Sequence, residues 1–123
     1  MNKKALIVVD HGSKKEKANK LLDEIVMYLQ KKKTDIIIEP AHMELAEPSI
    51  SNAIKTCIDN GATEIIVHPY MLSPGRHAIE DIPKMVEKES EKNPHIKMAI
   101  TKPLGLDDGI LDTVLKRYSE TEI

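Results

Sequence analysis

Hydrophobic positions along the chain follow two alternating patterns. Four short apolar runs are rich in β-branched residues and too short for helices, which is typical of strands buried in a sheet. These runs are residues 5–9 (ALIVV), 35–40 (DIIIEP), 64–69 (EIIVHP) and 96–101 (IKMAIT). In the segments between them, apolar residues recur with the period of an amphipathic helix. The clearest helical stripe is Ala18, Leu21, Leu22, Ile25, Val26 and Leu29.

Residues that favour helix ends place four helices between and after these strands. Ser13 and Glu16 have the spacing of a capping box, so the first helix is predicted to begin at Ser13. Pro83 is compatible with the third helix only in its first turn or at a kink. The other three helices are predicted from Pro48-Ser49 to Asn60-Gly61, from about Ile79 to Lys92, and from Asp107 or Asp108 to about Tyr118.

The strict alternation of strands and helices predicts an α/β fold. We expect one domain over residues 1–123, a three-layer sandwich whose four-stranded parallel sheet carries helices on both faces. If the strand order is 2-1-3-4, the order reverses between the first and third strands. Ligands of such sheets bind at that point, beyond the carboxyl ends of the strands.

Composition excludes several classes of function. Charged residues make up 31% of the chain and hydrophobic residues 41%, as in soluble globular proteins. The formal net charge of -2 argues against a nucleic-acid surface. The single cysteine, Cys57, excludes a disulfide within the chain and an all-cysteine metal site, and its helical face predicts a buried apolar role. No apolar run approaches a bilayer span and no targeting segment is visible, so we expect a cytoplasmic location without membrane contact.

Candidate chemistry gathers at the predicted carboxyl edge of the sheet. His11, Glu44 and His77 follow the first, second and third strands, so residues far apart in sequence meet at one edge. Two imidazoles and a carboxylate suit a divalent transition metal, and a neutral imidazole can also accept a proton. The alternative is that each histidine ends a strand and bonds to backbone.

The remaining polar residues have simpler interpretations beside functional ones. His68 is expected to be a satisfied residue at a strand end, His95 a solvated residue in a turn, and His42 a possible support behind the site. Gly12-Ser13 at a helix start can bind an anion, although Ser13 is equally explained as an N-cap. Arg76 can pair with a carboxylate or lie on the surface.

Four segments together resemble the sirohydrochlorin chelatases, the small single-domain class II tetrapyrrole metal chelatases. They are VVDHGS, EPAHMELAEPSI, HPYMLSPGRHAIEDIP and KPLG. The resemblance implies a chelatase or flavodoxin-like fold and an enzyme of siroheme or cobalamin-type biosynthesis. It would insert a divalent metal into sirohydrochlorin, with Fe2+ favoured and Co2+ or Ni2+ as alternatives.

The resemblance also implies roles for individual residues. His11 and His77 would bind the metal, and Glu44 would assist catalysis. Gly12, Ser13, Ser73 and Arg76 would contact the substrate, with Lys14 and Lys102 as further anchors for its carboxylates.

No nucleotide is expected, and a lone Cys57 does not suit the iron–sulfur cluster of some plant relatives. Short members pair as homodimers, so we expect one here. The alternative function is a non-catalytic metal or tetrapyrrole carrier that uses the same pocket.

Overall fold

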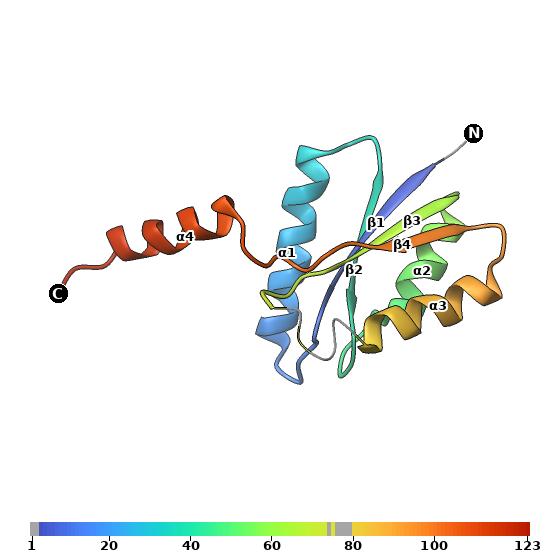
Figure 1. The fold of residues 1–123 in the computed structure, drawn as a ribbon, viewed down its shortest axis with the longest axis horizontal. Helices are drawn as coiled ribbons and strands as arrows, with labels where there is room; N and C mark the ends of the chain where they lie inside the picture. The colour runs from blue at the N-terminus through green and yellow to red at the C-terminus, as the bar shows by residue number, and fades with distance from the viewer. Residues whose placement is uncertain (1–2, 74, 76–79) are drawn as a thin grey trace.

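The computed structural model describes residues 3–73, residue 75 and residues 80–123. Strands and helices alternate along the chain as predicted (Figure 1). The elements are β1 (Lys4–Asp10), α1 (Glu16–Lys32), β2 (Ile37–His42), α2 (Ile50–Asp59), β3 (Glu64–Pro69), α3 (Ile82–Lys92), β4 (Lys97–Ile100) and α4 (Asp108–Ser119). No helix within these described ranges is both long and apolar enough to cross a membrane.

The four strands form one parallel sheet in the predicted order β2-β1-β3-β4. β1 lies between β2 and β3, with Ala5 opposite both Ile37 and Ile65. β2 begins two residues later than predicted and extends to His42. It contains Pro40, which lacks a backbone N–H, and this is tolerated because β2 is an edge strand. All four carboxyl ends therefore meet at one edge of the sheet.

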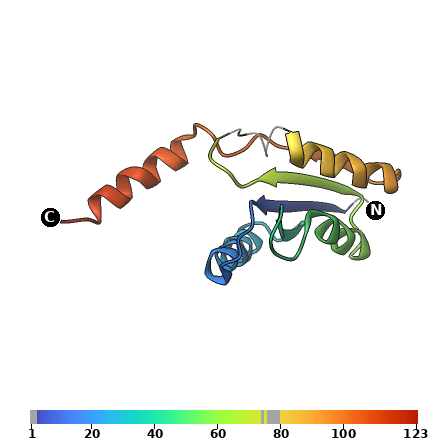
Figure 2. The ribbon, with the colours of Figure 1, turned by 90° about the horizontal axis from the view of Figure 1, so that it is seen from below.

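Helices cover both faces of the sheet unequally (Figures 1 and 2). α2 and α3 pack on one face, over a core that includes Ile7, Val67 and Ile54. α1 packs on the other face over β1 and β2, where Leu22 and Val26 are buried. The apolar area removed from water by the larger core is the main stabilising contribution of the fold.

The helix ends match the sequence signals at α2 but not at α1. α2 ends as a Schellman motif, because Gly61 N–H donates to Ile58 O and Ala62 N–H donates to Cys57 O, with a φ of 96° at Gly61. The predicted capping box of α1 is wrong. The cap position of α1 is Lys15, without a side-chain bond, because the Ser13 hydroxyl accepts from Lys15 N–H in a turn before the helix.

α3 and α4 agree with the sequence where the structure describes them. Pro83 lies in the first turn of α3, and the Asp107 carboxylate caps α4 by accepting from Gly109 N–H. α3 is assigned from Ile82, and the predicted start at Ile79 lies outside the described residues. Unlike the other three helices, α4 projects away from the sheet beyond its carboxyl edge (Figures 1 and 2), and none of its residues is buried.

Candidate functional site

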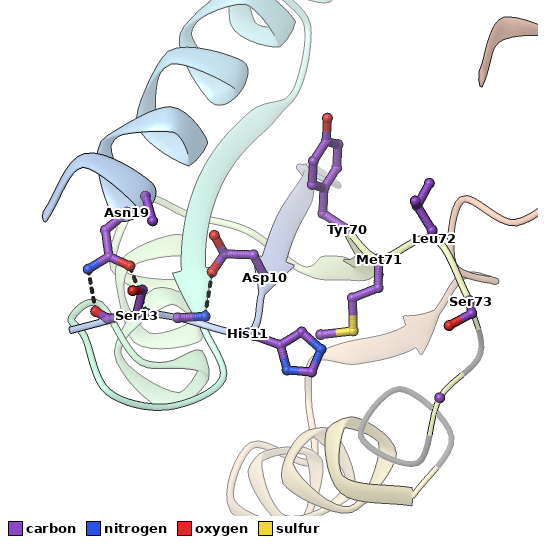
Figure 3. Close-up of a pocket in the computed structure, with 11 residues that line it drawn as sticks. Asp10, His11, Ser13, Asn19, Tyr70, Met71, Leu72 and Ser73 are labelled. Carbon is purple, nitrogen blue, oxygen red and sulfur yellow. Dashed lines mark hydrogen bonds between the residues drawn. The ribbon is translucent and has the colours of Figure 1, made fainter. Parts of the chain in front are cut away.

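A cavity of about 480 Å³ lies at the carboxyl edge of the sheet, between the loops after β1 and β3. This is the point at which the strand order reverses. Figure 3 shows side chains from both loops and from the start of α1 around it. The lining residues are Asp10, His11, Gly12, Ser13, Ala18, Asn19, Tyr70, Met71, Leu72, Ser73 and Gly75.

The loop after β1 brings three of the candidate site residues, His11, Gly12 and Ser13, to this cavity. His11 is exposed at its mouth, directly after the last residue of β1. Gly12 N–H donates to the Asp10 carboxylate at 3.0 Å, and Gly12 has a φ of 87°. A Cβ added at Gly12 would lie 1.8 Å from the carbonyl oxygen of Glu44. The turn therefore needs glycine for its backbone conformation and for the close approach of the next loop.

The loop after β2 continues the parallel pairing beyond the strands. Met43 N–H donates to Asp10 O at 2.9 Å, and Glu44 N–H donates to His11 O at 3.1 Å. Two residues predicted to share a site are thus joined through their main chains. The Glu44 side chain is exposed and is not among the residues that line the cavity. The structure brings the Glu44 main chain beside His11, while its exposed side chain lies outside the lining of the cavity.

Asn19 of α1 holds the turn at Ser13 and was not predicted. Its Oδ1 accepts from Ser13 N–H at 3.0 Å, and its Nδ2 donates to Ser13 O at 2.7 Å (Figure 3). The Gly12 and Ser13 N–H groups therefore already have acceptors within the chain. A substrate contact at this corner would use the Ser13 side chain or displace one of these bonds. Sequence spacing gives no signal for Asn19, since the pairing depends on the turn before α1.

The opposite wall is mainly apolar and comes from the segment after β3. Tyr70 and Leu72 are exposed, and Met71 is buried. Met71 and Leu72 carbonyls accept from Leu104 and Gly105 N–H at 2.9 and 2.8 Å, so the segment after β4 supports this wall. This wall therefore combines one aromatic ring, that of Tyr70, with the aliphatic and thioether side chains of Leu72 and Met71.

Two of the predicted site residues cannot be placed. Arg76 and His77 lie outside the described residues, whereas Ser73 is among the residues that line the cavity. In the described part of the chain, no group of three or more His, Cys, Asp or Glu side chains is arranged to hold a metal ion. A binding site that uses His77 is not tested by that finding.

The other histidines and the cysteine have the structural surroundings expected for them. His68 Nδ1 lies 2.7 Å from Thr101 Oγ1, and burial lowers the pKa of this imidazole. His95 is exposed in its turn. Cys57 is fully buried, and burial, with a smaller effect of the Glu39 charge, raises its thiol pKa to about 12. Cys57 is therefore a thiol of low reactivity at neutral pH.

His42 has a more specific environment than the sequence indicated. It is the last residue of β2, with 2% of its surface exposed, and its Nδ1 lies 2.6 Å from Asp10 Oδ1. Asp10 and His42 are also opposite one another in the register of β1 and β2. The imidazole is thus directly behind the turn that carries His11.

These features define an α/β protein with its ligand cavity at the switch point of a parallel sheet. The CbiX family model matches residues 5–121. The chain therefore belongs to the CbiX family, and this confirms the resemblance drawn from its motifs.

Named relatives agree with this assignment. A chloroplastic sirohydrochlorin ferrochelatase of Arabidopsis thaliana is 43% identical over 112 residues, which cover 91% of this chain and 50% of that protein. A sirohydrochlorin cobaltochelatase of Methanococcus maripaludis is 32% identical over 138 residues, covering 92% of this chain and 96% of that protein.

A solved structure shows the same arrangement of elements. SirB from Bacillus subtilis with Fe3+ superposes with a TM-score of 0.91 at 28% identity. The match covers 98% of this chain and 48% of the SirB chain. The chain spans about half the length of SirB and of the Arabidopsis relative, but nearly the full length of the Methanococcus relative.

Proposed function

We propose that this protein is a chelatase that inserts a divalent metal ion into sirohydrochlorin. The observation that carries the proposal is the exposed His11 imidazole at the mouth of a switch-point cavity, in a chain of the CbiX family. The relatives described above are named for insertion of iron or cobalt into this tetrapyrrole. We propose that residues 1–123 form one chelatase domain.

The reaction requires removal of two pyrrole N–H protons and exchange of metal-bound water for ring nitrogens. An imidazole such as His11 can hold the incoming metal through one nitrogen, or accept a proton when it is free of metal. We assign His77 as the second metal-binding imidazole on its sequence position. Glu44, whose main chain is bonded to His11, is assigned to assist as an outer ligand or a proton acceptor.

The walls of the cavity suit a flat ligand with charged edges. Tyr70, Met71 and Leu72 offer apolar surface to the macrocycle. The exposed cations Lys14, next to the lining residue Ser13, and Lys102, in the segment after β4, suit its peripheral carboxylates, as does Arg76 on its sequence position. Ser13 and Ser73 add hydroxyl groups to the lining.

The proposed metal is Fe2+, with Co2+ or Ni2+ as alternatives, and the proposed location is the cytoplasm. Iron and cobalt both occur in the names of the relatives, which supports a divalent transition metal without choosing between them. We propose that no nucleotide or iron–sulfur cluster takes part. The buried, single Cys57 does not suit cluster ligation.

We further propose that the active form is a homodimer in which the two carboxyl edges face a shared cleft. α4 supports this, because it extends beyond the carboxyl edge and presents the exposed apolar residues Leu111, Val114, Leu115 and Tyr118 on one helical stripe. Part of the α1 face of the sheet is also uncovered, at Ile66 of β3. A second copy would cover such apolar surfaces, which seldom remain exposed as extended patches on monomers.

The test is insertion of Fe2+, Co2+ and Ni2+ into sirohydrochlorin, followed by absorbance at equal free metal. We expect insertion well above the uncatalysed rate, and loss of most of this increase in His11→Ala and in His77→Ala while both remain folded. Wild-type rates in the double variant would refute the assignment of the two histidines. Tight binding of metal or tetrapyrrole with no insertion in a single turnover would identify a carrier.

A further inference from the structure

The buried histidine behind the site has no direct access to a substrate. The His42 side chain is 2% exposed, whereas that of Asp10 is 24% exposed at the cavity wall. His42 Nδ1 and Gly12 N–H both lie within hydrogen-bond distance of the same atom, Asp10 Oδ1, at 2.6 and 3.0 Å. A carboxylate oxygen only accepts, so His42 Nδ1–H is the donor in this pair.

These bonds act on the peptide groups on either side of His11. The Asp10–His11 peptide is held through Asp10 O, which accepts from Met43 N–H at 2.9 Å. The His11–Gly12 peptide is held at both ends, because His11 O accepts from Glu44 N–H and Gly12 N–H donates to Asp10 Oδ1. With both peptides fixed, the direction of the His11 Cα–Cβ bond is fixed as well.

A polar pair at this depth is not explained by stability alone. Burial of an imidazole and part of a carboxylate costs free energy that their hydrogen bond only offsets, and an apolar pair of similar volume would suffice to fill the space. The feature that an apolar pair cannot supply is direction. One oxygen satisfies two donors only in a single orientation of the Asp10 side chain, and that orientation determines where Gly12 N–H, and hence His11, lies.

We propose that His42 is a positioning residue that acts through Asp10 to aim the His11 imidazole at the metal. The inference rests on the proposed function of His11. It makes the imidazole of His42 necessary for rapid insertion, although His42 does not touch the metal or the tetrapyrrole.

The experiment uses the full chain and substitutes His42 with residues that keep one of its two ring-nitrogen positions or neither. In His42→Asn the amide nitrogen takes the place of Nδ1 and can still donate to Asp10. In His42→Gln the amide nitrogen corresponds to Nε2, and in His42→Leu there is no donor. Ile54→Val, a core variant of α2 remote from the cavity, is the control for a general loss of stability.

Two measurements are compared across these variants. The first is insertion of Co2+ into sirohydrochlorin, with kcat and KM for the tetrapyrrole determined separately. The second is a titration with Co2+ alone, followed by the visible absorbance of the bound ion. Residues that orient a metal ligand typically change affinity or activity by about 10- to 100-fold.

We expect His42→Leu and His42→Gln to lower kcat and Co2+ affinity by about tenfold or more, with KM changed by less than about twofold. His42→Asn should recover most of both losses, and Ile54→Val should lower the melting temperature without moving either. Equal kcat and Co2+ affinity in His42→Asn and His42→Gln would overturn the proposal, even if His42→Leu fails to fold.

The result also separates this inference from the proposed function. If the wild type inserts no metal but binds Co2+ through His11, the chelatase assignment fails. The difference in Co2+ affinity between His42→Asn and His42→Gln then still decides the role of His42. If the wild type binds no Co2+ and inserts none, both proposals fail, because there is no metal for His11 to meet.

Discussion

The Cα of Gly12 packs against the carbonyl oxygen of Glu44. A Cβ built on Gly12 would lie only 1.8 Å from that oxygen. The loops after β1 and β2 are therefore packed backbone against backbone. A main-chain bond from Glu44 N–H to His11 O, 3.1 Å long, joins the same two loops one residue away. The relative position of His11 and Glu44 is thus set by main-chain contacts.

Gly12→Ala should consequently destabilise the protein by more than about 2 kcal/mol, because the residue has a positive φ and its new methyl group would overlap backbone that cannot rotate away. Urea unfolding measures this change. Gly75→Ala is the matched control, since a Cβ at Gly75 meets no atom of the described residues within 4 Å, and its effect should stay within about 1 kcal/mol. Equal stability of the two variants would contradict the close packing of the loops.

Glu44→Gln should lower kcat by about tenfold or more while leaving KM for sirohydrochlorin nearly unchanged, because the amide keeps the shape of the side chain but neither accepts a proton nor carries charge. Glu47→Gln in the same loop is the control. Its Oε1 accepts from Asn52 Nδ2 at 2.6 Å, and a glutamine oxygen can preserve that bond. A large rise in KM with an unchanged kcat would instead make Glu44 a binding residue.

Arg76→Ala should raise KM for sirohydrochlorin about fivefold at low salt with little change in kcat, since an exposed charge pair contributes on the order of 1 kcal/mol. The effect should shrink as salt screens the pair. Lys55→Ala, which removes a cation paired with Asp59 on α2, is the control and should leave KM unmoved. A KM that does not respond to Arg76→Ala at low salt would assign this arginine to the surface.

The stability of the fold should depend on the protonation of His68. Burial lowers the pKa of His68 in the folded state below its usual value near 6.5, so the unfolded chain binds more protons when the pH falls. The contribution of neutral His68 is therefore fully present above about pH 6.5 and is lost as the pH falls through 6.5 toward the folded pKa.

Urea unfolding between about pH 5 and 8 tests this linkage. The stability of the wild type relative to His68→Asn should decrease as the pH is lowered. His95→Asn, which replaces an exposed histidine in a turn, should retain the wild-type pH dependence. A stability difference between wild type and His68→Asn that is flat across this range would contradict the linkage.

The fold was predictable from the sequence because each strand and most helices carry a local signal. The order β2-β1-β3-β4, the start of α2 after Pro48-Ser49 and its end at Asn60-Gly61 were all confirmed. The capping box at Ser13 was wrong because the turn before α1 is tied to Asn19, which lies six residues further on. Local spacing does not report such a pairing.

The site was predictable only in outline. The topology brings His11 and the loop of Ser73 to one cavity, which follows from the strand order alone. The bond from His42 to Asp10 depends instead on the register of β1 against β2, and β2 was predicted two residues too early. Because side-chain direction alternates along a strand, contacts between strands follow from the register and not from the identity of the residues.

The apolar stripe of α4 gives the last prediction. Leu115 and Tyr118 are 65% and 80% exposed, and one turn earlier Leu111 continues the same side of the helix. If a second copy covers this stripe, Leu115→Glu would bury a charge without a partner in the interface, which costs several kcal/mol. The dimer should then dissociate at least about a hundredfold more readily.

Light scattering after size exclusion at micromolar protein measures the assembly, and insertion of Co2+ measures its effect on activity. Lys116→Glu, on the opposite side of α4, makes a charge change without touching the stripe and should remain dimeric. Ile66→Glu should weaken the dimer if the uncovered part of the sheet receives the partner.

Because the shared cleft needs both carboxyl edges, insertion per chain should fall with the fraction of dimer. A wild type that is monomeric and fully active would refute the dimer, and a dimer unaffected by Leu115→Glu would place its interface away from α4.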